Sequence, residues 1–162
     1  MIVRSFAPIA APGAHTLILG SMPGTASLEA DEYYAHPRNA FWRIMGALYG
    51  AEPDLPYAER VAVLLVSSVA VWDVLQACER EGSLDADIRA EVPNDFAAFF
   101  SAHAGIRRIG LNGGKAAASF RKHAARFLPA GAEMRVLPST SPAHAARGFE
   151  EKCALWREAL FS

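Results

Sequence analysis

Residues 20–42 read GSMPGTASLEADEYYAHPRNAFW and follow directly on the apolar run Leu17–Leu19. An apolar run that meets two glycines and a proline within five residues is typical of a buried strand that ends in a tight loop. Phe41, Ile44 and Leu48 then recur at helical spacing, which predicts a helix over residues 39–49. Because ligands of open α/β sheets bind at the carboxyl ends of strands, we expect the functional site at this strand-to-helix connection.

The rest of the sequence alternates between strand and helix patterns. Strands are predicted over residues 15–21, 61–69, 108–112 and 134–137, and helices from residue 71, after Asn94 as N-cap, from residue 114 to near 129, and over 149–160. Residues 82–93 read as an irregular acidic connection. Buried strands that alternate with helices form parallel sheets covered on both faces. We therefore predict an α/β fold, a three-layer α/β/α sandwich around a mainly parallel four-stranded sheet.

The composition limits the class of protein. With 162 residues, 52% of them hydrophobic and 20% charged, the chain has enough apolar content for one globular domain over residues 1–162. Its two cysteines, Cys78 and Cys153, fit no disulfide framework, redox motif or four-cysteine iron–sulfur cluster, and its histidines lack ligand-like spacing. The longest apolar run, residues 61–72, is too short to span a bilayer. We expect a monomeric cytoplasmic protein without metal, cofactor or membrane partner.

Charge is distributed unevenly along the sequence. Residues 50–95 contain ten acidic and three basic side chains, whereas residues 107–147 contain eight basic side chains and one acidic side chain, Glu133. If the basic segment shares a face with the loop at residues 20–24, it can follow the phosphates of a nucleic acid while the acidic segment lies away from them. The alternative is that both segments are ordinary solvated helix faces.

Two motifs frame the sequence. The first is Gly20, Ser21, Met22, Pro23 and Gly24, followed by Tyr34 and by HPRNAFW at residues 36–42, and the second is LPSTSPA at residues 137–143. Together with VWDVL at 71–75 and LNG at 111–113, they resemble the uracil-DNA glycosylase superfamily, most closely its hypoxanthine-DNA branch and also its mismatch-specific branch. The resemblance covers nearly the whole chain. It implies a monofunctional glycosylase of base-excision repair whose partner is double-stranded DNA containing a deaminated or mismatched base.

The resemblance also implies roles for residues of the first motif. Asn39 would hold the attacking water beside the sugar, although an asparagine at the start of a helix is also a common cap. Tyr34 matches the aromatic residue that stacks on the extruded base, and its neighbour Tyr33 reads as a packing residue. Histidine is the usual acid near neutral pH, so His36 is a candidate to protonate the leaving purine, with a structural role as the alternative.

Further polar residues follow the predicted strands. Ser67, Ser68 and Asn112 are expected at strand ends facing the cleft, where they can read the base edge or satisfy local turns. The second motif offers hydroxyls and backbone N–H groups suited to a phosphate, and its DNA-binding candidates are Pro138, Ser139, Thr140, Ser141 and His144. It contains no large apolar residue to fill the gap in a duplex. Either His144 or Arg147 is therefore inserted instead, or extrusion of the base depends on the mispair already being weak.

Two positions depart from the superfamily pattern. Met22 stands where other branches have a catalytic aspartate or asparagine, and Leu137 stands where the most active uracil enzymes have a histidine. Neither side chain can activate water or donate to a leaving group, which favours the hypoxanthine-DNA branch over uracil or thymine mismatch activity. A small-molecule nucleoside or nucleotide hydrolase with the same fold, and a lesion-binding protein without catalysis, remain as alternatives.

Overall fold

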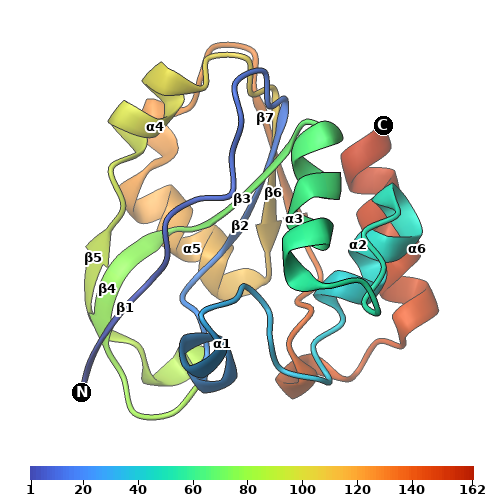
Figure 1. The fold of residues 1–162 in the computed structure, drawn as a ribbon. Coiled ribbons are helices and arrows are strands. Elements are labelled where there is room, and N and C mark those ends of the chain that lie inside the picture. Colours follow the sequence, from blue (N-terminus) through green and yellow to red (C-terminus); the bar gives the residue numbers. More distant parts are fainter.

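A four-stranded parallel sheet forms the centre of the protein, and a computed structural model describes all 162 residues (Figure 1). The strand order is β3–β2–β6–β7, with β2 over Thr16–Gly20, β3 over Val69–Asp73, β6 over Arg108–Asn112 and β7 over Glu133–Leu137. The predicted α/β class and the four-stranded parallel sheet are confirmed. All the carboxyl ends meet at one edge, where parallel sheets place their ligands.

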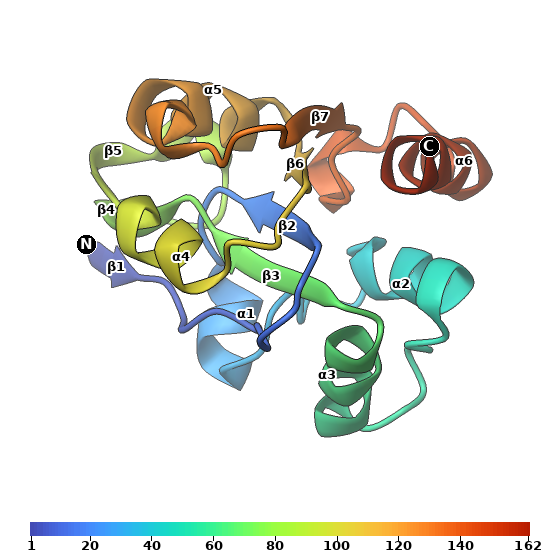
Figure 2. The ribbon, with the colours of Figure 1, turned by 90° about the horizontal axis from the view of Figure 1, so that it is seen from above.

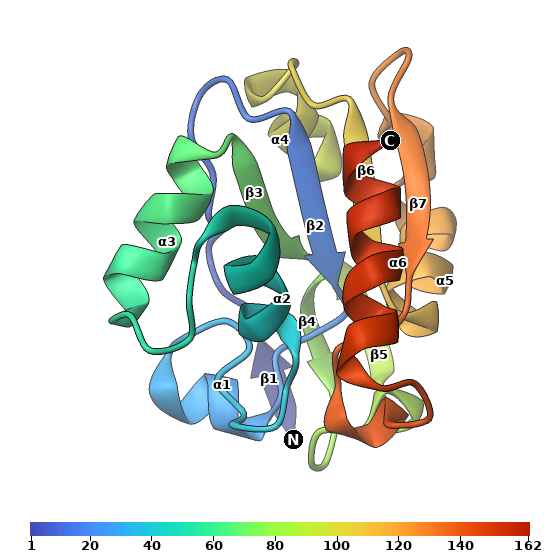
Figure 3. The same ribbon diagram turned by 90° about the vertical axis from the view of Figure 1, so that its right-hand side faces the viewer.

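Helices cover both faces of this sheet (Figures 2 and 3). Ile18 of β2 packs on one side with α2 (Phe41–Tyr49), α3 (Tyr57–Val66) and α6 (Phe149–Phe161). Leu17 and Leu19 point to the other side, toward α4 (Phe96–Ala102) and α5 (Gly114–His123). Because side chains alternate along a strand, each strand contributes to two separate cores. No helix combines the length and the apolar character needed to cross a membrane.

A second, antiparallel sheet was not predicted. It consists of β1 (Ile2–Arg4), β4 (Leu75–Glu79) and β5 (Arg89–Pro93), in the order β1–β4–β5. The chain passes from β3 into β4 with a single residue between them, Val74, whose N–H donates to the carbonyl of Gly20. The β4–β5 connection, residues 80–88, thereby returns to the carboxyl edge of the main sheet and includes a short 3₁₀ turn at Asp85–Asp87.

Four local predictions were wrong. The segment at 61–69 is the end of α3 followed by the start of β3, because a continuous apolar run fits a buried helix as well as a buried strand. The helix expected from residue 71 is replaced by β3 and β4, and the connection at 82–93 ends in β5. The N-cap of α4 is Asp95, which accepts from the Ala98 N–H at 3.0 Å, because the Asn94 side chain donates to the Asp73 carbonyl instead.

Candidate active site

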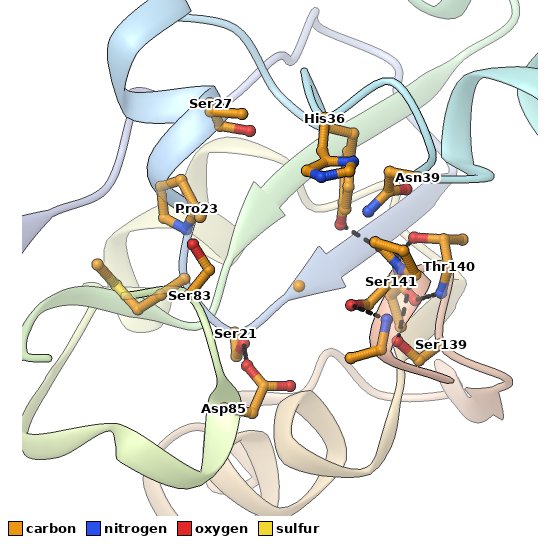
Figure 4. Close-up of a pocket in the computed structure, with 18 of the residues that line it drawn as sticks. Ser21, Pro23, Ser27, His36, Asn39, Ser83, Asp85, Ser139, Thr140 and Ser141 are labelled. Atoms are coloured by element: carbon orange, nitrogen blue, oxygen red, sulfur yellow. Dashed lines mark hydrogen bonds between the residues drawn. The ribbon is translucent and has the colours of Figure 1, made fainter. Parts of the chain in front are cut away.

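A cavity of about 360 Å³ opens at the carboxyl ends of β2, β3 and β6 (Figure 4). This volume lies within the range of small-molecule binding pockets. Four segments form its wall: the loop after β2 with the start of α1 (Thr25–Ala30), the stretch before α2, residues 83–86 and the loop after β7. The two motifs found in the sequence therefore meet at one site, together with a segment that belongs to neither motif.

The loop Gly20–Gly24 is fixed by its contacts. A Cβ atom at Gly20 would lie 2.8 Å from both the Asp73 Oδ1 and the Tyr34 Oη, so only glycine fits at this point of the floor. The buried Arg80 guanidinium donates to the Pro23 carbonyl from below. Met22 is buried in the core as well as lining the cavity, so its side chain contributes packing at the position where other branches have a polar residue.

Tyr34 lies against Phe41, with ring centroids 4.0 Å apart and an interplanar angle of 17°. Its backbone is left-handed, with φ of 54°, a conformation that costs a tyrosine about 1 kcal/mol or more. Burial raises the pKa of the Tyr34 phenol well above its usual range, so the hydroxyl stays neutral. The ring also lines the cavity, so the side not covered by Phe41 can contact a flat ligand. Tyr33 touches the cavity as well, but it is buried and its hydroxyl donates to the Ala7 carbonyl, as expected of a packing residue.

Asn39 makes a local hydrogen bond at the start of α2 and also faces the cavity. The N-cap position of α2 is Ala40, and Asn39 lies one residue before it. The Asn39 Oδ1 accepts from the Phe41 N–H at 2.9 Å in a local turn and so caps the first free N–H of the helix. The side chain also lines the cavity, and its Nδ2 has no protein partner. An amide oxygen has a second lone pair, so Oδ1 and Nδ2 together can orient a water while the cap stays intact. The cap fixes the direction in which the amide points.

His36 lines the same wall as Asn39 (Figure 4). Its Nδ1 accepts from the Arg38 N–H at 3.1 Å, which assigns the proton of the neutral ring to Nε2. A neutral His36 can therefore donate a hydrogen bond through Nε2 to a group in the cavity. The fixed ring orientation is compatible with the predicted role as hydrogen-bond donor or acid to a leaving base.

Asn112, at the end of β6, connects three parts of the wall. Its Oδ1 accepts from the Thr140 N–H at 3.0 Å, and its Nδ2 donates to the Thr140 Oγ1 at 3.0 Å and the Tyr34 Oη at 3.2 Å. Both amide hydrogens are thus occupied, and only one lone pair of Oδ1 remains for a base edge. The geometry gives Asn112 a positioning role, and base reading by this residue stays a prediction.

The loop after β7 contributes hydroxyl groups to the cavity. Ser139, Thr140, Ser141 and His144 line it, whereas Pro138 does not and instead accepts from the Trp156 Nε1 through its carbonyl. The hydroxyl oxygens of Ser139 and Ser141 each accept a backbone N–H two residues further on. Because a hydroxyl that accepts can still donate, both protons are available to a ligand oxygen.

The placement predicted for Ser67 and Ser68 is wrong. Ser67 ends α3, and Ser68 precedes β3 at its amino end, where its carbonyl accepts from the N–H groups of His15 and Thr16. Both residues therefore lie at the edge of the sheet opposite the cavity. The error follows from the wrong strand boundaries, since a strand ending near residue 69 would have placed them beside the ligand.

The predicted basic face is also corrected by the structure. Arg107 lies just before β6 and Arg108 lies at its amino end. Arg121 and Lys122 lie in the last turn of α5, about 11 Å along the helix from its first residue, which follows the cavity residue Asn112 by two positions (Figure 1). The acidic connection at residues 81–87, by contrast, reaches the cavity wall. Sequence proximity to a motif does not give spatial proximity, because each helix carries the chain across the whole sheet.

Asp73, at the end of β3, was not predicted as a site residue. It is buried, lines the cavity beside Gly20, and its Oδ2 has no hydrogen-bond partner. Burial raises the pKa of this carboxyl to about 7, and the negative Asp85 adds to the effect while Arg80 opposes it. The sequence did contain a signal for this residue: Asp73 is the one charged side chain in the apolar run 69–75. Because burying a charge without a partner is costly, such a residue is a candidate for a functional role.

This raised pKa predicts a pH dependence of stability. The unfolded chain ionises Asp73 near pH 4 and the folded protein near pH 7, so folding loses stability as pH rises through this interval, by up to about 1.4 kcal/mol per pH unit. Asp73→Asn removes the ionisation. We expect urea unfolding at pH 5 and pH 8 to show a smaller loss of stability in the variant. Equal losses in both proteins would show that Asp73 titrates normally.

No three His, Cys, Asp or Glu side chains cluster in a way that could hold a metal ion.

Comparison with known proteins gives a family match. The model of the Uracil DNA glycosylase superfamily matches residues 7–161. A protein of Methanosarcina acetivorans named hypoxanthine DNA glycosylase is 35% identical over 162 residues, covering 99% of both chains. One of the same name from Methanosarcina barkeri is 31% identical over 158 residues, covering 97% of both.

A solved structure is similar to the fold as a whole. It is the solution NMR structure of a candidate uracil DNA glycosylase from Methanosarcina acetivorans, with a TM-score of 0.80 and 34% identity over 98% of this chain and 99% of that one. The family model and the relatives cover the cavity residues as well as the sheet. The chain therefore belongs to the uracil DNA glycosylase superfamily.

Proposed function

We propose that this protein is a monofunctional DNA glycosylase that hydrolytically releases hypoxanthine from double-stranded DNA. The observation that carries the proposal is the pairing of Tyr34 and Asn39 on one cavity wall, with an aromatic face beside a fixed amide. The two relatives named hypoxanthine DNA glycosylase support this choice of base, since each matches at least 97% of the chain. Met22 offers no group that could activate water, which agrees with an enzyme that depends on the amide.

The geometry suggests how the reaction proceeds. The extruded base stacks on Tyr34, and Asn39 orients a water toward the sugar carbon as the N-glycosidic bond breaks. The bonding electrons leave with the base, and the His36 Nε2–H can donate to the purine as negative charge develops on it. Water then forms the new bond to the sugar, its surplus proton passes to the solvent, and the released base takes up a proton from the solvent. We expect the free hydroxyl protons of Ser139 and Ser141 to donate to an adjacent phosphate, since both hydroxyl oxygens only accept within the protein.

The test is a base-release assay on duplexes that differ in one base. Hypoxanthine, uracil, xanthine or mismatched thymine is placed in the same sequence, and alkaline cleavage reports the abasic product. Release of hypoxanthine above the other bases is the expected result. Release of uracil or thymine alone would indicate a mismatch enzyme, and binding without release would indicate a lesion binder. Hydrolysis of free nucleosides without DNA binding would indicate a small-molecule enzyme.

Salt dependence separates basic residues near the cavity from those far away. Arg38 is exposed between two cavity residues, whereas Arg121 and Lys122 are exposed at the far end of α5. Arg38→Ala should weaken binding to every duplex and reduce the slope of log affinity against log salt by roughly one unit. The double change Arg121→Ala and Lys122→Ala should leave the slope unchanged. The reverse pattern would mean that DNA lies along α5.

A further inference from the structure

Lys152, in α6, is a buried cation without an ionic partner. Only three charged side chains of the protein are buried, Asp73, Arg80 and Lys152. The positive charge of Arg80 opposes the rise in the pKa of Asp73, so these two charges partly balance each other. Lys152 is 5% exposed and forms no ion pair, and burial lowers the pKa of its ammonium group. The folded protein therefore holds this charge at a cost, and a counter-charge from outside would reduce that cost.

The Lys152 ammonium lies directly behind the loop after β7. Its Nζ donates to the His144 carbonyl at 2.8 Å, and the Trp156 Nε1 donates to the Pro138 carbonyl at 2.9 Å. Because these two side chains are four residues apart on one face of α6, the helix holds both ends of the segment 138–144 (Figure 3). His144 itself lines the cavity, so the charge lies one residue behind the cavity wall. Two of the three ammonium N–H bonds have no protein partner.

The front of the same loop suits an anion. The hydroxyl protons of Ser139 and Ser141 are free on the cavity side. The carbonyls at both ends of the loop are bound by α6, and the Thr140 carbonyl accepts from the Ala40 N–H at 3.0 Å. Since these carbonyl oxygens are occupied inside the protein, the loop combines free hydroxyl donors with a buried positive charge behind them. This combination is suited to a phosphate.

The opposite side of the mouth is acidic. Residues 81–87 carry three carboxylates and no basic residue, so they repel phosphates. The segment is held in place, because the Ser83 Oγ accepts from the Thr25 N–H at 2.8 Å and the Ser21 Oγ donates to the Asp85 Oδ1 at 2.7 Å (Figure 4). We therefore expect the backbone of a bound strand to run along the loop after β7 and not along this segment.

We propose that Lys152 supplies the positive charge with which the loop after β7 binds a DNA phosphate, without touching the DNA itself. The inference rests on the proposed function, because it requires DNA at this mouth. A bound phosphate provides the counter-charge that the folded protein lacks, and salt screens a buried charge less than an exposed one. Lys152 is thus a positioning residue, which fixes the loop through the His144 carbonyl and raises its affinity for the backbone.

The test is Lys152→Met, which keeps the apolar stem of the side chain and removes its charge. We expect binding to duplexes with or without hypoxanthine to weaken about tenfold, and the slope of log affinity against log salt to fall by up to about one unit. The single-turnover rate of base release at saturating protein should change less than about threefold, because the charge acts on binding. Unchanged affinity, or a loss of affinity with an unchanged slope, would overturn the proposal.

A second variant separates the charge from the hydrogen bond. Lys152→Gln removes the charge and keeps a donor for the His144 carbonyl, so it should show the same fall in slope as Lys152→Met. A Lys152→Gln protein with the affinity and slope of wild type would mean that only the hydrogen bond matters, which contradicts the proposal. This variant also covers the case in which Lys152→Met does not fold.

Two further variants serve as controls. Arg157→Met removes the same charge from an exposed position on α6, so the slope should stay at the wild-type value. Ser139→Ala removes a hydroxyl donor but no charge, so it should weaken binding and leave the slope unchanged. If Arg157→Met lowers the slope as much as Lys152→Met does, the effect comes from net charge alone and the proposal is wrong.

Binding is measured by fluorescence anisotropy of a labelled duplex, which requires no catalysis. If wild type binds DNA but releases no base, the proposed catalysis fails and the salt slopes still decide the role of Lys152. If wild type binds no DNA, both proposals fall.

Discussion

Asn39→Ala should bind hypoxanthine-containing DNA nearly as well as wild type and lose base release by about a hundredfold or more. The amide is expected to position water in the transition state, and misplacing a reacting group by about 1 Å is enough for a loss of this size. Single-turnover release and binding titrations on the same duplex separate the two effects. Met22→Ala should cost much less, because that side chain has no group that can hold or activate water and contributes packing.

The cap that Asn39 forms calls for a matched variant. Asn39→Ser keeps an oxygen that can accept from the Phe41 N–H but removes the amide nitrogen. Both variants should lose base release, whereas only Asn39→Ala should lose the cap, worth about 0.5 to 2 kcal/mol of stability. If Asn39→Ser restores both stability and activity, the asparagine acts through the helix cap and not through water.

Tyr34→Ala should reduce base release roughly five- to a hundredfold, which corresponds to a stacking contribution of about 1 to 3 kcal/mol. The loss should be similar for every base the enzyme accepts, because an aromatic face does not read hydrogen-bonding groups. Tyr34→Phe keeps the ring and loses only the hydrogen bond from Asn112, so it should retain most of the activity. Release rates on hypoxanthine and uracil duplexes provide the measurement.

The neighbouring tyrosine supplies the control for this experiment. Tyr33→Phe removes the hydroxyl that donates to the Ala7 carbonyl and leaves the ring in the core, so activity should not change. Full activity in Tyr34→Ala would contradict stacking on this ring. A drop that differs strongly between hypoxanthine and uracil would instead indicate that the Tyr34 hydroxyl reads the base edge.

The sequence predicted those parts of the fold and site that depend on local patterns. The strand 108–112 and the helix from residue 41 have boundaries marked by apolar periodicity and by glycine or proline. The two motifs also identified most of the cavity wall. Val61–Val69 was misread because apolar continuity carries no period, and this error displaced Ser67 and Ser68 from their true position.

The remaining features depend on contacts between distant residues. The second sheet pairs Ile2 with Glu79, and nothing near either residue indicates its partner. The pKa of Asp73 depends on how deeply the folded protein encloses it. Leu84 reaches the cavity only because the β4–β5 connection folds back onto Thr25. Patterns within a short stretch of sequence do not reveal these contacts between distant residues.

The hydrogen bonds from residues 83 and 85 to the first motif also determine where the chain tolerates a change in length. One residue added between Ser83 and Asp85 would change the spacing of the two anchor points, so the two hydrogen bonds could no longer form together as they do now. The turn at residues 129–132 is different, because it precedes β7 at the far edge of the sheet and makes no contact with the cavity wall. A fluorescent label or fused domain would therefore be carried there without altering the site.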